Sequence, residues 1–254
     1  MNTYLNNINR IEFIITLACT GRCKHCSEGD HKIVGEHIDK DIAAKAVRQI
    51  AEEYNIQSIM TFGGEPLLYP DAVCQIHSAA RELNIPTRQL ITNGYFSKKI
   101  TRINTVADQI AESGVNDVLL SVDAFHQETI PLDYVKSFAE ALKVRGVPIR
   151  THPAWLVSSE ADNPYNKKTK DILNAFSSMG ILANSGNVIF PSGNARKYLS
   201  EYFDLSKETK SPYWEDPQDV RSVCVGPDGN LIGGNIYKQD ISEIFSAYNP
   251  ETNS

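Results

Sequence analysis

The chain has 254 residues, of which 41% are hydrophobic, so it can bury the core of one large α/β domain with a small extension but not of two full domains. Its formal net charge is −6 at pH 7. Because a nucleic-acid-binding surface needs a basic stripe, this charge argues against a nucleic-acid partner and favours a small molecule or a peptide.

No apolar run approaches the roughly 20 residues that a membrane-spanning helix needs. Residues 1–10 are polar and lack the apolar segment of a cleavable signal. We therefore expect a cytoplasmic protein with no membrane partner. Thiols stay reduced in the cytoplasm, so clustered cysteines are predicted to bind metal rather than to form disulfides.

Strand-like and helix-like segments alternate along the first three quarters of the chain. Residues 11–17 form a nearly continuous apolar run, which is typical of a strand covered on both faces of a parallel sheet. Six consecutive βα units predict a parallel sheet with right-handed crossovers, either open and doubly wound or an incomplete barrel. Further strands are expected at 58–62, 88–92, 117–122, 148–156 and 187–190, and helices at 37–54, 70–83, 103–113, 133–145 and 168–179.

The alternation stops near residue 191, so we predict a core domain over residues 8–193 and a C-terminal extension over residues 194–254. Residues 204–219 form a polar, proline-containing loop that carries Tyr213 and Trp214. Loops of this length often cover active sites, so we expect this loop to be a lid over the sheet's open end.

The extension also contains a turn signal between two short apolar segments. Pro227-Asp228-Gly229-Asn230 is typical of a hairpin turn, and residues 220–225 and 231–233 flank it. A short helix is expected at 195–203 and a final helix at 240–248. The extension is therefore predicted to be a small hairpin followed by a helix.

Three of the five cysteines, Cys19, Cys23 and Cys26, lie within eight residues directly after the first expected strand. Such clusters bind zinc or iron–sulfur, although an incidental cluster of thiols is a third interpretation. A tetrahedral zinc needs a fourth ligand, for which His25 and His31 are near in the sequence. A [4Fe–4S] cluster held by three cysteines instead leaves one iron open for an exogenous chelator.

Glycine and polar residues end the next three expected strands, at the edge of the sheet where ligands of parallel α/β folds bind. Gly63 and Gly64 lack Cβ atoms and let a ligand approach the backbone closely, and Glu65 adds a carboxylate. Asn93 follows the third strand, and Ser121 and Asp123 end the fourth. Because strand side chains alternate with period two, Ser121 and Asp123 are expected to point to the same face. Each of these residues is also consistent with a structural role as a strand cap or in a turn.

The C-x3-C-x2-C spacing, Gly63-Gly64-Glu65-Pro66 and the polar ends of strands three and four together resemble the radical S-adenosylmethionine (SAM) superfamily over about residues 10–193. The resemblance implies a partial (β/α)6 TIM-like barrel with one [4Fe–4S] cluster and SAM as cofactors. It further implies reductive cleavage of SAM to a 5′-deoxyadenosyl radical, which abstracts hydrogen from a substrate. An electron donor such as flavodoxin or ferredoxin is then required.

The resemblance also implies roles for individual residues. Cys19, Cys23 and Cys26 would bind the cluster, and Gly63, Gly64 and Glu65 would hold the methionyl ammonium group of SAM. Asn93, Ser121 and Asp123 would bind ribose or carboxylate groups of SAM, and His25 would lie near the adenine.

The segments around Gly63 and around Gly229 resemble the branch that carries SPASM or twitch domains and modifies peptides or tetrapyrroles. Beyond the three clustered cysteines only Cys74 and Cys224 remain, which is too few for a second cluster. We therefore expect hydrogen abstraction from a peptide or small molecule. The alternatives are activation of a glycyl-radical partner enzyme and, in another class, a non-catalytic zinc- or Fe–S-binding module.

Three residues are candidates for contact with the substrate. His126 follows the fourth expected strand, His152 lies on the fifth, and Cys224 precedes the hairpin turn. An S–H bond is weaker than a C–H bond, so Cys224 is a candidate donor of a hydrogen atom to a substrate radical. For each of the three, packing or ordinary hydrogen bonding is the competing interpretation.

Overall fold

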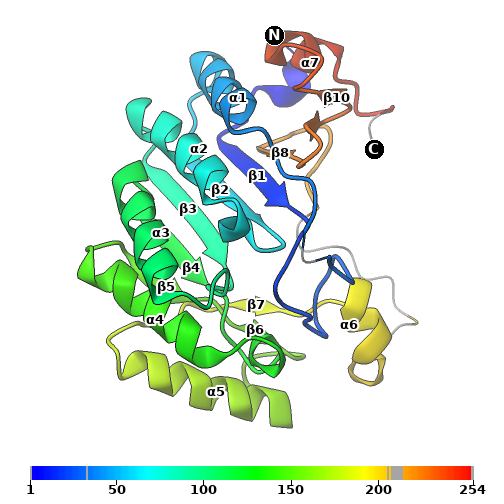
Figure 1. Cartoon of the computed structure of the whole chain (residues 1–254). Helices are drawn as coiled ribbons and strands as arrows, with labels where there is room; N and C mark the ends of the chain where they lie inside the picture. Colours follow the sequence, from blue (N-terminus) through cyan, green and yellow to red (C-terminus); the bar gives the residue numbers. More distant parts are fainter. Residues whose placement is uncertain (1, 33, 205, 207–213, 253–254) are drawn as a thin grey trace.

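The structure is a computed structural model that describes residues 2–32, 34–204, 206 and 214–252 (Figure 1). Six parallel strands form one sheet in the order β5-β4-β3-β2-β1-β8. The predicted parallel α/β fold is thus confirmed. The strands are β1 (Arg10–Thr16), β2 (Ser58–Gly63), β3 (Thr87–Thr92), β4 (Asp117–Leu120), β5 (Ile149–Thr151) and β8 (Ser222–Val225).

Helices lie side by side along one face of this sheet (Figure 1). They are α1 (Lys40–Glu53), α2 (Pro70–Glu82), α3 (Ile100–Ser113) and α4 (Leu132–Val144). Ile11 and Phe13 of β1 and Val47 and Ile50 of α1 are fully buried between the two layers. Because strand side chains alternate between faces, the other face of β1 is left for the site described below.

The fifth expected strand, 148–156, is broken in two. Pro153 has no N–H group and interrupts the ladder, so only β5 pairs with β4. The next segment, β6 (Ala154–Trp155), pairs in parallel with β7 (Asn187–Val188) in a separate two-stranded sheet. α5 (Pro164–Ser177) connects them. This arrangement continues the turn of the strands and is consistent with a partial barrel.

The C-terminal segment differs from the predicted hairpin. β8 pairs in parallel with β1 rather than with residues 231–233, because Val223 and Val225 extend the buried layer of β1. The observed hairpin is smaller and joins β9 (Asn230–Leu231) to β10 (Gly234–Asn235). The predicted boundary at residue 193 therefore leaves one strand of the core sheet in the extension.

The final helix, α7 (Ile241–Ala247), lies beside α1, and an ion pair of 2.7 Å joins Asp240 to Lys45. In place of one helix at 195–203 there are α6 (Gly193–Tyr198) and a 3-10 turn at Ser200–Tyr202. Other 3-10 turns span Thr3–Leu5, Pro66–Leu68 and His126–Glu128.

Among the described residues, none of the helices has both the length and the apolar character that crossing a membrane requires.

Candidate functional site

A cavity of about 840 Å³ lies on the face of the sheet opposite α1–α4, and all six strands of the sheet contribute to its wall. Arg10, Glu12 and Ile14 of β1 face it, while the intervening Ile11 and Phe13 are buried beneath the helices. The period-two alternation of strand side chains therefore gives each strand one apolar face and one face on the cavity.

The three clustered cysteines all line this cavity, as predicted from their position after β1. The Gly21 N–H donates to Cys19 Sγ at 3.3 Å, and Cys26 Sγ lies 3.0 Å from His31 Nε2. Burial raises the pKa of Cys19 to about 11 and raises the pKa values of Cys23 and Cys26 as well. Thiols in such surroundings become thiolates when a metal binds them, because the metal supplies the missing positive charge.

The spacing of these thiols fits a multi-iron cluster better than a single ion. One zinc holds thiolates at about 2.3 Å and therefore needs its ligand sulfurs within about 4 Å of one another. In the described part of the chain, the three ligand atoms found within 4.8 Å of one another belong to Cys23, His25 and His126, not to the three cysteines. A Cβ atom on Gly21 would lie 3.3 Å from Cys23 Sγ and 3.7 Å from Cys19 Sγ, so a glycine keeps room open between these two sulfurs.

Residues 17–26, which follow β1 and carry the three cysteines, are called the cysteine loop. Neighbouring elements hold its backbone in place. The Glu65 N–H donates to the Ala18 carbonyl at 2.8 Å, beside the end of β2. From the start of α6, the Asn194 N–H donates to the Cys26 carbonyl at 2.8 Å and its Nδ2 to the Cys23 carbonyl at 3.2 Å. Asn194 could not be predicted as part of the site, since nothing in its local sequence links it to a loop about 170 residues earlier.

Gly64 packs so closely against the cysteine loop that any side chain should displace the loop. A Cβ atom at this position would lie 2.1 Å from the Ala18 carbonyl oxygen. We expect Gly64→Ala to lower the free energy of unfolding by about 1–3 kcal/mol, the usual cost of overpacking. The amount of iron bound per chain after anaerobic reconstitution should fall as well, because the displaced loop carries the cysteines.

Gly35→Ala is the matched control for this prediction. Its Cβ atom would lie 3.5 Å from Ala18 Cβ, an ordinary contact with the same loop. The free energy of unfolding, measured with denaturant, and the iron content should therefore be the same in Gly35→Ala as in the wild type. Full iron binding and normal stability in Gly64→Ala would show that the loop tolerates the displacement.

Glu65 lies behind the cavity wall rather than in it. Its side chain is fully buried, and its oxygens accept hydrogen bonds from Leu67 N at 2.9 Å, Thr92 Oγ1 at 2.7 Å and Asn93 N at 2.9 Å. Burial raises the pKa of Glu65 to about 7, against the lowering effect of these three donors. The carboxylate therefore joins the end of β2 to the end of β3, instead of facing a ligand as the sequence analysis expected.

Five of the other predicted SAM-binding residues line the cavity, namely Gly63, Gly64, Asn93, Ser121 and His25. The backbone of Gly63 and Gly64 lines it, and Asn93 lies 3.6 Å through Nδ2 from Cys19 Sγ and 3.3 Å from Thr20 Oγ1. Asn93 thus extends from the end of β3 to the cysteine loop, and the Glu65 carboxylate fixes its backbone.

Ser121 and Asp123 do not share a face, contrary to the expectation from strand alternation. β4 ends at Leu120, so the period of two no longer applies beyond it. Ser121 lines the cavity, whereas Asp123 is fully buried and does not. Asp123 Oδ2 accepts from His126 Nδ1 at 2.8 Å and from Ala154 N at 3.0 Å.

Asp123 instead fixes the orientation of His126. Its Oδ1 accepts from the backbone N–H groups of Phe125 and His126, both at 2.9 Å. Although burial opposes it, the charge and hydrogen bonds of His126 hold the pKa of Asp123 below its ordinary value. With Nδ1 bound to this carboxylate, His126 is held at the cavity wall by a fixed ring orientation.

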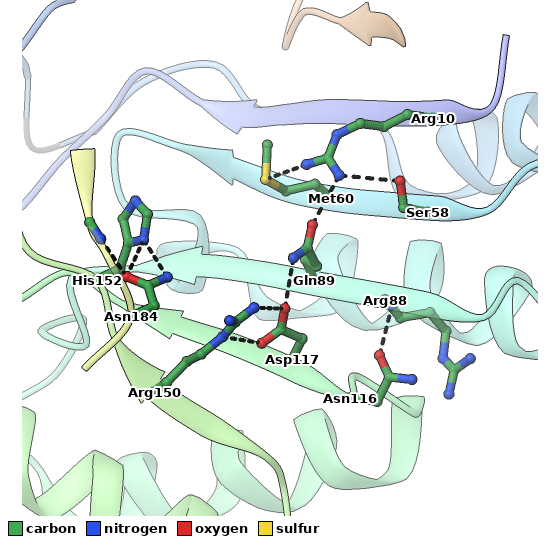
Figure 2. A network of polar contacts seen from close by, with 11 residues as sticks. Arg10, Ser58, Met60, Arg88, Gln89, Asn116, Asp117, Arg150, His152 and Asn184 are labelled. Carbon is green, nitrogen blue, oxygen red and sulfur yellow. Dashed lines mark hydrogen bonds and ion pairs between the residues drawn. The ribbon is translucent and has the colours of Figure 1, made fainter. Parts of the chain in front are cut away.

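The two other predicted histidines also line the cavity. The ring of His25 lies 5.1 Å from that of Phe125 and 4.8 Å from that of His126, and burial lowers the pKa of His25 to about 4. His152 Nδ1 lies 3.0 Å from Asn184 Oδ1, and burial lowers its pKa too (Figure 2). Both rings are therefore neutral near pH 7.

Cys224 lines the cavity from β8, while Cys74 lies on α2 and is not part of its wall. Cys224 is exposed at the cavity wall, and desolvation by the surrounding groups, with a contribution from the charge of Glu12, raises the pKa of its thiol to about 12. The thiol therefore stays protonated in the physiological range. Sequence alone could not show that Cys224 lines the same cavity as the cysteine loop.

Half of the predicted lid, residues 204–219, lies outside the part of the chain that the structure describes. Residues 205 and 207–213, including Tyr213, lie outside the described part of the chain. Trp214 is described and is 60% exposed. The lid stays a prediction.

The sequence profile of the radical SAM superfamily matches residues 13–193. The chain belongs to this superfamily. It is therefore an enzyme that uses SAM and a [4Fe–4S] cluster, and the interpretation as a non-catalytic zinc module is wrong. The matched range includes the three cysteines and the strand ends described above.

Among curated relatives, the chain is similar to the probable GTP 3′,8-cyclase of Methanocaldococcus jannaschii, with 25% identity over 121 residues. That match covers 48% of this chain and 38% of the relative, so the two proteins share only part of their length.

Two solved structures show the same fold at low identity. SuiB of Streptococcus suis bound to S-adenosylmethionine superposes with a TM-score of 0.61 at 14% identity, covering 94% of this chain and 66% of SuiB. Native anSMEcpe with bound AdoMet gives a TM-score of 0.60 at 17% identity, covering 96% and 81%. These likenesses support the partial barrel; they do not confirm a SPASM-like tail.

Proposed function

We propose that this radical SAM enzyme cleaves SAM reductively at a single cluster and takes a hydrogen atom from a peptide or small molecule bound in the same cavity. The observation that carries the proposal is that Cys19, Cys23 and Cys26 open onto one cavity with His126 and Cys224. A radical formed at the cluster would need no long path to reach a substrate held there.

The cysteine loop and the strand ends divide the work of holding the cofactors. Cys19, Cys23 and Cys26 would bind three irons and leave the fourth to SAM. When bound, the reduced cluster supplies the electron that breaks a sulfonium C–S bond of SAM and yields the 5′-deoxyadenosyl radical. A flavodoxin- or ferredoxin-like donor would supply that electron.

The SAM molecule would contact backbone at Gly63 and Gly64 and the side chains of Asn93 and Ser121. Neutral His25 would lie near the adenine. Its Nδ1 is buried without a hydrogen-bond partner in the described part of the chain, and the adenine would provide that partner. In this proposal Glu65 acts indirectly, by fixing the backbone of Asn93.

The substrate side of the cavity would be formed by His126 and His152. Asp123 holds the His126 ring in one orientation, and Asn184 does the same for His152. Imidazoles held in one orientation can position a substrate through hydrogen bonds to their other ring nitrogen.

Charge disfavours transferring the substrate of the GTP cyclases to this chain. Among described residues, the formally charged ones that line the cavity are two arginines, Arg10 and Arg150, and two glutamates, Glu12 and Glu28. A triphosphate needs a clear excess of positive charge, which this wall lacks. A peptide fits better, and SuiB with the precursor peptide SuiA is one of the structures with this fold.

Anaerobic reconstitution with iron and sulfide tests the proposal. We expect about four irons per chain and, with dithionite as reductant, formation of 5′-deoxyadenosine from SAM. One tightly held zinc per chain with no cleavage of SAM would overturn it.

A further inference from the structure

A row of side chains crosses the floor of the cavity, in the amino-terminal half of the strands, and the proposed reaction does not use it (Figure 2). Its members are cross-strand neighbours on four adjacent strands. Glu12 pairs with Met60, Met60 with Gln89, and Gln89 with Asp117. Figure 2 shows Arg10 and Arg150 reaching into the row from its two ends, and Glu12 joins it through Arg10. We call these six residues the floor row; they are Arg10, Glu12, Met60, Gln89, Asp117 and Arg150.

The Asp117 end of the floor row is saturated with hydrogen bonds. Arg150 donates to the two oxygens of Asp117 at 3.0 Å and 2.7 Å, and Gln89 Nε2 donates to Oδ2 at 2.7 Å. Gln89 Oε1 in turn accepts from Arg10 Nη1 at 3.0 Å. This half of the row has full partners and serves to fix the floor.

The Arg10 end is not saturated. Arg10 Nε donates to Glu12 Oε1 at 2.6 Å, but Arg10 Nη2 is directed at the thioether sulfur of Met60 at 3.0 Å, a weak acceptor. In the described part of the chain no group donates to Glu12 Oε2. The side chains of Arg10 and Glu12 are 27% and 21% exposed, and both line the cavity. An underused donor therefore lies beside a free carboxylate oxygen.

A ligand for this end needs an acceptor for Arg10 and a donor for Glu12 together. A carboxylate or phosphate would meet Arg10 but be repelled by Glu12, and an ammonium group would meet the reverse problem. An amide carries both groups without charge. Above the floor row, apolar side chains of the next row line the cavity and suit an aliphatic stem; they are Ile14, Phe62, Ile91 and Leu119.

We propose that Arg10 and Glu12 form a substrate-recognition site for a neutral amide, whose carbonyl accepts from Arg10 Nη2 and whose N–H donates to Glu12 Oε2. The inference rests on the proposed function, since it names the substrate class of that cavity. The amide belongs either to a carboxamide side chain or to a peptide bond.

Saturation-transfer NMR titrations with three probes that share a six-carbon acyl chain test this without cluster or SAM. The probes are hexanamide, N-methylhexanamide and hexanoate. The wild-type protein should bind at least one of the amides more tightly than hexanoate, and the stronger of the two shows whether the site takes a carboxamide or a peptide bond. Glu12→Gln leaves the charge of Arg10 uncompensated, so the preference should shift toward hexanoate by about tenfold or more.

Arg88→Lys is the matched control, because Arg88 lies on β3 outside the cavity wall and donates to the carbonyls of Gly114 and Ile85. It should keep the wild-type preference. If circular dichroism shows that Glu12→Gln is unfolded, Met60→Leu removes the sulfur acceptor at similar volume and should leave amide binding equal or tighter.

Equal binding of all three probes, no binding, or tighter binding of hexanoate to the wild type would overturn the proposal. So would an unchanged preference in a folded Glu12→Gln, or loss of amide binding in Met60→Leu. Because the probes report binding alone, failure of SAM cleavage would sink the proposed reaction and leave this site standing.

Discussion

Cys23→Ala should leave the protein almost without iron, falling from about four irons per chain to less than one after anaerobic reconstitution. Cys23 is 8% exposed, lines the cavity, and has its backbone carbonyl held by Asn194. A cluster bound by three cysteines loses a third of its protein ligands with this change, and the carbon that replaces the sulfur cannot bind iron. Iron analysis and visible absorption measure the loss, and formation of 5′-deoxyadenosine should stop with it.

Cys74→Ala provides the control for general damage by loss of a thiol. Cys74 packs on α2 against the core and lies outside the cavity wall. Its alanine variant should keep full iron and full SAM cleavage. If Cys23→Ala kept four irons, or if Cys74→Ala lost them, the assignment of the cluster to the loop after β1 would be wrong.

The parts of this site that could be predicted from sequence are those that local patterns determine. The apolar run of β1 marks a buried parallel strand, and the cysteine spacing directly after it places three thiols at that strand's carboxyl end. Gly63 and Gly64 were predicted at the cavity for the same reason: they follow a strand, and a ligand site at strand ends needs close approach.

The errors came where distant contacts override local signals. The turn at 227–230 favours a hairpin. Pairing of β8 with β1, about 210 residues earlier in the chain, instead buries Val223 and Val225 in the core. Asp123 was assigned to the cavity by extending strand alternation beyond Leu120, where β4 already ends. Neither outcome can be derived from the neighbouring residues alone.

The floor row was missed although it left a trace in the sequence. Glu12 interrupts an apolar strand in which both neighbours are buried, and a charged residue at such a position needs partners. Its hydrogen-bond partner is Arg10 of the same strand, and Arg10 in turn donates to Ser58 and Gln89. Ser58 and Gln89 stand at the beginnings of other strands, and only the register of the sheet shows that these side chains meet.

Cys224 should be required for solvent deuterium to enter the product, if this thiol is the donor that returns a hydrogen atom to the substrate radical. In D2O its exchangeable hydrogen becomes deuterium, and the high pKa of about 12 keeps that atom on sulfur. Transfer breaks the S–H bond and forms the stronger C–H bond, which leaves a thiyl radical. One electron from the reductant and one proton from the solvent must then restore the thiol. The product should therefore carry one deuterium by mass spectrometry.

The position of Cys224 makes the matched variants informative. It lies next to Glu12 in the sheet register, at the level of the floor row and away from the cysteine loop at the strand ends, so the donor and the cluster would act on a substrate from different positions. Cys224→Ala should abolish deuterium incorporation while formation of 5′-deoxyadenosine continues, and Cys74→Ala should change neither. Deuterium that persists in Cys224→Ala would assign the second hydrogen to another donor. Loss of SAM cleavage in that variant would instead make Cys224 a structural residue, because hydrogen return follows cleavage and cannot be needed for it.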